Sequence, residues 1–205
     1  MKKSLILATT AFSLISSLAH AKTQGNYVEL DAIHTNVQSP DYYGEKHSDS
    51  NISYGLGYKY AFNFNNFFIA PGVFFNYNNT DNNYTDKDGP GTATYKSRLN
   101  NSYGAKLDLG YDFTDKFAAF ASVGLQQNRI TSKYYFGSTS KGIRRSNEES
   151  ILFGGGIKYS VTNNIDLNLA YEISEYDIAY YDMLESTENN NNKIEVVKVG
   201  VSYNF

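Results

Sequence analysis

The nine residues from Val197 to Phe205 read VKVGVSYNF. Val197, Val199, Val201, Tyr203 and Phe205 occupy every second position, and the intervening positions hold lysine, glycine, serine and asparagine. A period of two places the two sets on opposite faces of a β-strand. The stretch therefore predicts a strand with one apolar face and one small or polar face, which continues to the last residue of the sequence.

The same alternation recurs along the chain. It predicts eight strands, at residues 26–35, 51–62, 67–78, 101–113, 117–128, 150–161, 165–176 and 194–205. Residues 63–66, 114–116 and 162–164 are tight polar turns, whereas about 36–50, 79–100, 129–149 and 177–193 are long connections rich in Asn, Asp, Ser, Gly and Lys. Short and long connections that alternate predict an all-β fold, an eight-stranded antiparallel up-and-down barrel with its long loops at one end.

The aromatic residues indicate which face of the strands is turned outward. Those near the short turns are Tyr60, Phe62, Phe67, Tyr111, Phe113, Phe117, Tyr159, Tyr203 and Phe205, and those nearer the long connections are Tyr54, Tyr77, Tyr103 and Tyr176. Aliphatic residues lie between the two groups. Two aromatic girdles around an aliphatic band are typical of a barrel in lipid, so we expect a transmembrane β-barrel. A soluble barrel, with this face turned inward, is the alternative, because periodicity alone does not say which face points in.

The opposite face carries small residues and charges of both signs. The charges expected inside the barrel are Glu29, Asp31, Lys59, Lys106, Asp108, Asp112, Lys158, Asp166, Glu172 and Lys198. Eight strands leave an interior just wide enough for side chains to fill. We therefore expect ion pairs that plug the lumen. Lys106 and Asp108, two apart on one strand, share a face and are one candidate pair, and partners across the barrel are the other possibility.

Residues 1–21 have the features of a secretory signal peptide. Lys2 and Lys3 precede an apolar run over residues 5–18, and Ala19-His20-Ala21 forms an A-x-A cleavage site. The run is shorter than the ~20 apolar residues of a membrane-spanning helix, which disfavours an uncleaved anchor. The sequence thus predicts a signal peptide at 1–21 and one barrel domain at 22–205.

Several function classes are disfavoured by composition. The chain has no Cys, which excludes disulfides, thiolate metal sites and cysteine nucleophiles, and its net charge of −3 gives no reason to expect nucleic-acid binding. Beyond the signal peptide only His34 and His47 could act as general bases, and no G-x-S-x-G stretch is present. We expect no catalytic residue, no metal site and no cofactor.

The signal peptide, the alternating strands and the terminal VGVSYNF resemble the small outer-membrane β-barrels, the family of OmpX, the OmpA membrane domain and the opacity-type proteins. The resemblance covers residues 22–205. It implies that Val199, Val201, Tyr203 and Phe205 form the signal read by the barrel-assembly machinery. It also implies a location in the outer membrane, with its lipid and lipopolysaccharide as partners. We expect no peptidoglycan-binding domain after Phe205, which would be a departure from full-length OmpA.

Two functions are consistent with these features. The first is a structural or adhesive surface protein whose four long loops contact lipopolysaccharide or host surface molecules, and the second is a small porin. Lys141, Arg144 and Arg145, in the third long connection, are candidates for contacts with lipopolysaccharide phosphates or acidic host glycans. A solvated loop beside Glu148 and Glu149 is the alternative for these cations.

Overall fold

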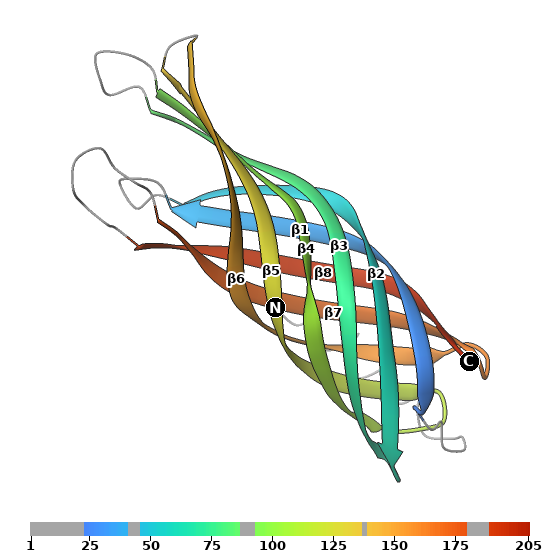
Figure 1. Ribbon diagram of the computed structural model, residues 1–205. Helices are drawn as coiled ribbons and strands as arrows, with labels where there is room; N and C mark the ends of the chain where they lie inside the picture. Colours follow the sequence, from blue (N-terminus) through green and yellow to red (C-terminus); the bar gives the residue numbers. More distant parts are fainter. Residues whose placement is uncertain (1–22, 41–45, 87–92, 137–138, 180–188) are drawn as a thin grey trace, which may run out of the picture.

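The chain forms a closed barrel of eight antiparallel strands (Figure 1). The computed structural model describes residues 23–40, 46–86, 93–136, 139–179 and 189–205, so the predicted signal peptide lies outside the described residues. The strands are β1 (Gly25–Pro40), β2 (Lys46–Phe64), β3 (Phe67–Asp86), β4 (Ala93–Asp112), β5 (Phe117–Phe136), β6 (Thr139–Ser160), β7 (Ile165–Ala179) and β8 (Asn189–Asn204). Each strand pairs with its sequence neighbours, and the predicted fold class is confirmed. Within the described ranges, no helix is long and apolar enough to span a membrane.

The barrel closes between its first and last strands. In the β1–β8 ladder Val28 lies opposite Tyr203 and Leu30 opposite Val201. The apolar residues of the C-terminal stretch therefore lie beside the apolar residues of β1 on the same face of the sheet. Closure leaves no unpaired sheet edge, so the backbone N–H and C=O groups of the edge strands form hydrogen bonds with each other. Hydrocarbon could not supply these bonds.

The short turns lie at one end of the barrel, and two of them share one geometry. In the β4–β5 turn the N–H of Phe117 donates to Thr114 Oγ1 over 3.0 Å, and in the β6–β7 turn the N–H of Ile165 donates to Thr162 Oγ1 over 3.0 Å. The threonine hydroxyl thus supplies a side-chain acceptor for an N–H group of the turn. The β2–β3 turn is tighter and places Asn65 at φ 63°, a left-handed conformation that Asn tolerates.

The other end differs from the sequence prediction, because most of the predicted long loops are strand. β3 continues to Asp86, β4 begins at Ala93, β5 continues to Phe136 and β6 begins at Thr139. β6 is therefore 22 residues long, whereas a strand that crosses a membrane needs about 9–11. The extensions carry polar residues on both faces, so their sequence shows no apolar alternation. The backbone ladder to the neighbouring strand holds them together (Figure 1).

Two register shifts mark the base of these extensions. One lies between Tyr77 and Thr80 on β3, where Asn79 has φ 79°, and the other lies between Leu99 and Asn101 on β4. An extra residue in a strand reverses which parity faces inward beyond it. Leu99 consequently faces the interior, although the inward residues of β4 below the shift have even numbers.

Candidate functional site: the barrel interior and the outer wall

A cluster of six charges from five strands lies buried in the middle of the lumen. Lys59 Nζ is 2.6 Å from Glu29 Oε1 and 3.1 Å from Asp108 Oδ2. Lys106 Nζ is 3.1 Å from Glu172 Oε1 and 3.8 Å from Asp108 Oδ1. Lys198 Nζ is 2.6 Å from Glu172 Oε2. Three ammonium groups thus balance three carboxylates, which offsets the large cost of removing each charge from water.

The ion pairs show that the interior partners come from several strands. The pair on one strand, Lys106 and Asp108, is the longest contact of the cluster, and the shorter contacts run between strands. Asp31, also expected inside, is half-buried beside the cluster. A methyl group at the facing Gly200 would collide with Asp31 Oδ1, so glycine at this position of β8 leaves room for the Asp31 side chain.

A second polar cluster closes the short-turn end and includes the start of the described chain. Thr23 is buried, and its N–H and hydroxyl donate to the Asp112 carboxylate over 3.0 Å and 2.6 Å. Lys158 donates to the hydroxyl of Thr23 and lies 3.5 Å from Asp166 Oδ2. Gly25, at φ 105°, turns the chain inward in a conformation that side chains rarely adopt. The segment before β1 therefore forms part of the filling of the lumen.

Uncharged polar side chains form a hydrogen-bonded layer on the loop side of the charge cluster. Asn78 Nδ2 donates to Ser102 Oγ over 2.9 Å, and Ser102 Oγ donates to Asn128 Oδ1 over 2.6 Å. Asn128 Nδ2 donates to Ser150 Oγ over 3.0 Å. The chain of bonds crosses β3, β4, β5 and β6. Such a network satisfies buried polar groups and favours one arrangement of the strands.

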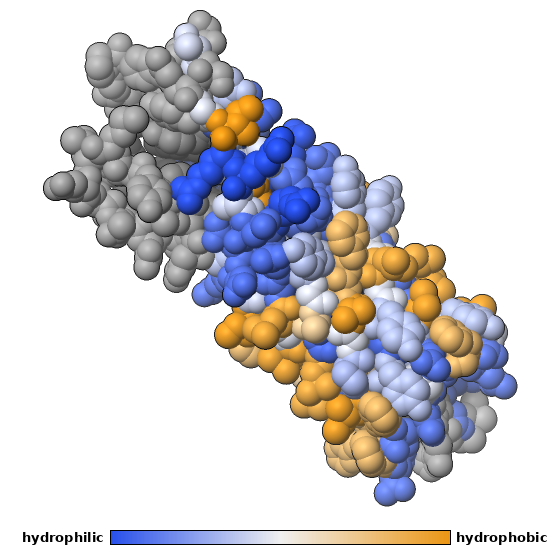
Figure 2. All heavy atoms as spheres, in the orientation of Figure 1, coloured by the Kyte–Doolittle hydropathy of each residue, from blue (hydrophilic) through white to orange (hydrophobic). Residues whose placement is uncertain are grey.

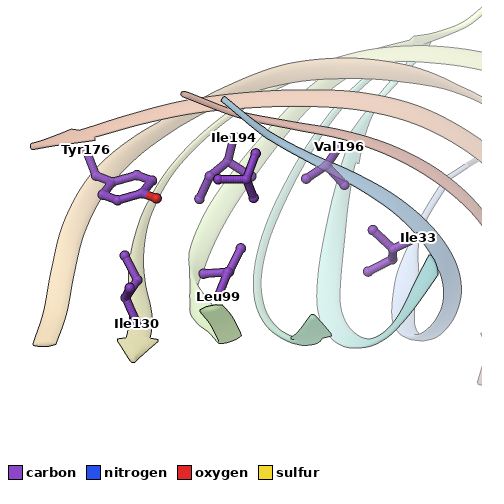
Figure 3. Close-up of a cluster of buried hydrophobic side chains, with 7 residues drawn as sticks. Ile33, Leu99, Ile130, Tyr176, Ile194 and Val196 are labelled. Atoms are coloured by element: carbon purple, nitrogen blue, oxygen red, sulfur yellow. The ribbon is translucent and has the colours of Figure 1, made fainter. Parts of the chain in front are cut away.

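An apolar cluster lies inside the barrel toward its loop-side end, and sequence reasoning missed it (Figure 3). Its members are Ile33, Val37, Leu99, Ile130, Tyr176, Ile194 and Val196. The sequence analysis placed Tyr176 in the outer aromatic girdle, but its side chain is 5% exposed and points inward. The prediction for Tyr176 was wrong because an aromatic residue near a strand end fits either a girdle or a lumen plug.

These layers fill the barrel interior. Between the polar layer and the apolar cluster a cavity of about 10 Å³ remains, lined in part by Asn76, Gln126, Leu152 and Ile194. A single water needs about that much space. The described interior is thus a packed core of paired charges, amides and aliphatic side chains.

The outward face carries an exposed apolar band around the turn-side half of the barrel (Figure 2). Leu125 is 68% exposed, Ile52 67%, Val199 59% and Phe153 55%. Aromatic side chains pack together at the turn-side edge, where the ring centroids of Phe67 and Tyr111 lie 4.8 Å apart. An apolar surface of this extent on a closed barrel matches the lipid face of a transmembrane barrel.

Above the band, the strand extensions form a hydrophilic wall, seen as the blue region next to the orange band in Figure 2. Five exposed cations project outward from β4, β5 and β6, and we call them the basic wall: Lys96, Arg98, Arg129, Lys133 and Arg145. The pairing of β5 with its two neighbours places Arg98 and Arg145 on either side of Thr131, and Lys96 opposite Lys133. Among the described residues, one carboxylate forms an ion pair with this wall, since Arg98 Nε lies 2.5 Å from Asp81 Oδ1.

The predicted anion-contact residues fall partly on this wall. Arg144 and Arg145 are exposed residues of β6 rather than of a loop. As neighbours in a strand they lie on opposite faces of the sheet, and Arg145 is the one on the outward face with the basic wall. Lys141 also belongs to β6, but its side chain lies outside what the structure describes. Sequence reasoning missed Lys96, Arg98, Arg129 and Lys133, because only the pairing of β5 with β4 and with β6 brings these cations together.

The other predicted positions lie as follows. Val199, Val201, Tyr203 and Phe205 are all exposed on the outward face of the barrel at β8. His34 faces outward on β1, whereas His47 lies on the lumen-facing parity of β2. Among the described residues, no group of three or more His, Cys, Asp or Glu side chains is arranged to hold a metal ion.

Comparison with solved structures shows the same architecture in several proteins of other sequence. Neisserial surface protein A is 18% identical, with a TM-score of 0.50 over 88% of this chain and 97% of that chain. Ail, the attachment invasion locus protein of Yersinia pestis, solved with the heparin analogue sucrose octasulfate, is 14% identical, with a TM-score of 0.51 over 89% and 100%. OprG of Pseudomonas aeruginosa is 15% identical, with a TM-score of 0.50 over 90% and 98%. At these identities the likeness concerns the fold.

The family comparison covers nearly the whole chain. No curated protein sequence gives a significant match. The sequence profile of the family described as outer membrane protein beta-barrel domain matches residues 4–205. With its closed eight-stranded barrel, its outward apolar band and its charged interior, this chain belongs to the family of outer membrane protein β-barrel domains.

Proposed function

We propose that this protein is a surface-interaction barrel of the outer membrane, whose projecting strand extensions contact molecules at or beyond the outer leaflet. The observation that carries the proposal is the length of β3 to β6 (20 to 22 residues), about twice what the bilayer requires. The part of each strand beyond the apolar band has no role in spanning the membrane. It holds a continuous polar surface in a fixed position outside the hydrocarbon.

The filled interior supports a surface role over a porin role. The charge cluster, the hydrogen-bonded layer and the apolar cluster succeed one another along the lumen, and an ion would have to displace buried ion pairs. A pathway for solutes needs a polar and water-filled lumen. Ail, the attachment invasion locus protein, offers a parallel at the level of fold.

Bilayer conductance tests the choice between the two functions. The purified barrel should give no stable single-channel steps in planar bilayers, because the charge cluster, the hydrogen-bonded layer and the apolar cluster occupy the described lumen. A barrel of the same family with a known open channel serves as the positive control. Large and stable steps from the native protein would refute the surface-interaction proposal in favour of the porin.

Shortening the strand extensions tests the interaction itself. Asp81 pairs with Arg98 in the ladder, and Thr131 pairs with Arg145, so residues 82–97 and 132–144 can each be replaced by Asn-Gly, which favours a two-residue hairpin turn. Cells that carry the shortened barrel should adhere less to host cells and to glycan-coated surfaces. The matched control replaces only residues 87–92 by Asn-Gly, and it should adhere like the native protein. Equal adhesion by the shortened and native barrels would contradict the proposal.

A further inference from the structure

The chain just before β1 leaves the barrel wall and enters the lumen. Thr23 is 2% exposed, and it bonds to Asp112 on β4 and to Lys158 on β6. β1 pairs with β2 and β8, so neither of these partner strands is a neighbour of β1 in the sheet. We call residues 23 and 24 the N-terminal strap. The strap spans the lumen from the start of β1 to strands on other sides of the barrel.

The buried end of the strap supplies hydrogen bonds to a carboxylate of β4. Asp112 is 2% exposed and accepts bonds from the Thr23 N–H over 3.0 Å, from the Thr23 hydroxyl over 2.6 Å and from Asn63 Nδ2 over 3.0 Å. Two of these three donors belong to Thr23. Because a buried carboxylate without such donors is costly, the end of β4 forms a binding site for the strap.

Two further strands complete this binding site. The Lys158 ammonium of β6 donates to the Thr23 hydroxyl and lies 5.3 Å from the centre of the Tyr27 ring. On the other side, Asn204 Nδ2 of β8 donates to the carbonyl oxygen of Gln24 over 2.9 Å. The site thus needs β4, β6 and β8 in their final places, and it exists only in the closed barrel.

The strap is held differently from the strand that follows it. Two ladders of backbone hydrogen bonds hold β1, one to β2 and one to β8. The strap precedes both ladders and is held by the individual bonds named above. Gly25, at φ 105°, forms the joint between strap and strand. The strap can therefore leave its site while both ladders stay intact, as in the local opening of a segment outside a cooperative unit.

We propose that the N-terminal strap docks after the barrel has closed and then holds the barrel closed. Because its site requires three strands from around the lumen, a docked strap stabilises the closed barrel and not a partly opened one. An interaction that forms only after the transition state slows unfolding and leaves the folding rate unchanged. The proposal concerns the persistence of the barrel and is independent of what the strand extensions contact.

Thiol labelling tests whether the strap opens by itself. The chain has no cysteine, so Thr23→Cys and Thr35→Cys each introduce a single thiol, the first in the strap and the second in the β1 ladder. Both threonines are buried. Each full-length variant is refolded in phospholipid vesicles and exposed to N-ethylmaleimide in increasing urea, while gel mobility reports the folded barrel. The thiol at position 23 should react at least tenfold faster than the barrel unfolds, and the thiol at position 35 only as it unfolds.

Unfolding kinetics test whether the strap holds the barrel closed. Thr23→Val keeps the side-chain volume and removes the hydroxyl that bonds to Asp112. Loss of one hydrogen bond to a charged group shifts a folding equilibrium about tenfold or more. Thr23→Val should therefore unfold about tenfold faster and fold at the native rate. The matched control, Thr35→Val, removes a buried hydroxyl that bonds to Asn78 Oδ1 over 3.2 Å, and it should also slow folding, because β1 has to be in place before the sheet closes.

The outcomes distinguish a strap from an ordinary part of the barrel. Reaction at position 23 alone in the folded barrel, with faster unfolding of Thr23→Val at an unchanged folding rate, supports the proposal. Reaction at position 23 only on global unfolding would overturn it, since the segment would then be a fixed part of the wall. Reaction at both positions in the folded barrel, or at position 23 as fast as in the unfolded chain, would overturn it as well. Folding of Thr23→Val that is slowed as much as that of Thr35→Val would place docking before closure and refute the proposal.

Discussion

Replacing Lys106 by methionine isolates the contribution of the buried charge cluster. Lys106 Nζ lies 3.1 Å from Glu172 and 3.8 Å from Asp108, and both carboxylates are fully buried. Lys106→Met keeps a long apolar stem but leaves three carboxylates against two ammonium groups. Removing one partner of a buried ion pair costs about 3–5 kcal/mol. We expect the lower limit, about 3 kcal/mol, because Asp108 keeps Lys59 and Glu172 keeps Lys198.

A second substitution distinguishes the charge imbalance from the loss of packing. Lys106→Met with Asp108→Asn leaves two neutral pairs, Lys59 with Glu29 and Lys198 with Glu172, each at 2.6 Å. The amide can still accept the hydrogen bond that Ser122 Oγ donates to position 108 over 2.7 Å. The double variant should therefore lose less stability than the sum of the two single variants, by at least about 1 kcal/mol.

Equilibrium unfolding measures these differences. The barrels are refolded in phospholipid vesicles, and the urea midpoint is followed by far-UV circular dichroism and by the shift in gel mobility between folded and unfolded forms. Lys116→Met, the same substitution at an exposed residue of the β4–β5 turn, is the control and should change the free energy of unfolding by less than about 0.5 kcal/mol. A midpoint for Lys106→Met equal to that of the native protein, or strict additivity in the double variant, would refute the reasoning.

Three further predictions concern the ends of the barrel. Gly25→Ala should lower the free energy of unfolding by roughly 1–3 kcal/mol in the same assay, because φ is 105° and the new Cβ would lie 2.9 Å from Asn204 Oδ1. Phe205→Asp should reduce the amount of folded barrel in the outer membrane, whereas Phe205→Tyr should not; equal amounts by quantitative immunoblot would remove the basis for an insertion signal. The hydrogen bond from Lys193 holds the pKa of Glu195, above the apolar band, below its ordinary 4.5, so this carboxylate adds stability above that pH and loses it as the pH falls through the lowered pKa. Lys193→Met should flatten the dependence of the urea midpoint on pH in this acidic range, and an unchanged slope would contradict the assignment.

The apolar and polar alternation by itself determined the class of fold. In β2, for example, Tyr54, Leu56 and Tyr58 alternate with Ser53, Gly55 and Gly57, and the first set faces outward while the second faces the lumen. The sequence shows this pattern because one face of a membrane strand contacts lipid and the other contacts the lumen along the whole span. The turns were equally readable, since short polar segments between two alternating runs leave little choice of connection.

The sequence was a poor guide to where the strands end. The extensions of β3 to β6 meet water on their outer face and mixed side chains inside, so polar residues follow one another as they do in a loop. Their strand conformation depends on hydrogen bonds to a neighbouring strand, and the local sequence does not indicate which segment that neighbour is. Tyr176 and Leu99 were misread or missed for a related reason, since an apolar residue near a strand end gives no sign of its facing, and a register shift exchanges the two faces.

The partners of the lumen charges were also decided by the tertiary structure. Alternation assigns Lys106, Asp108 and Glu172 to one face of their strands, and it does not say which meet. Closure of the sheet brings β4 and β7 to opposite walls of a narrow lumen, where Lys106 reaches Glu172. The basic wall likewise exists only because β4, β5 and β6 pair in one register. A periodic pattern determines which face of the strand each side chain lies on, because that depends on the strand alone. Contacts between strands depend on register and closure, and these are properties of the whole barrel.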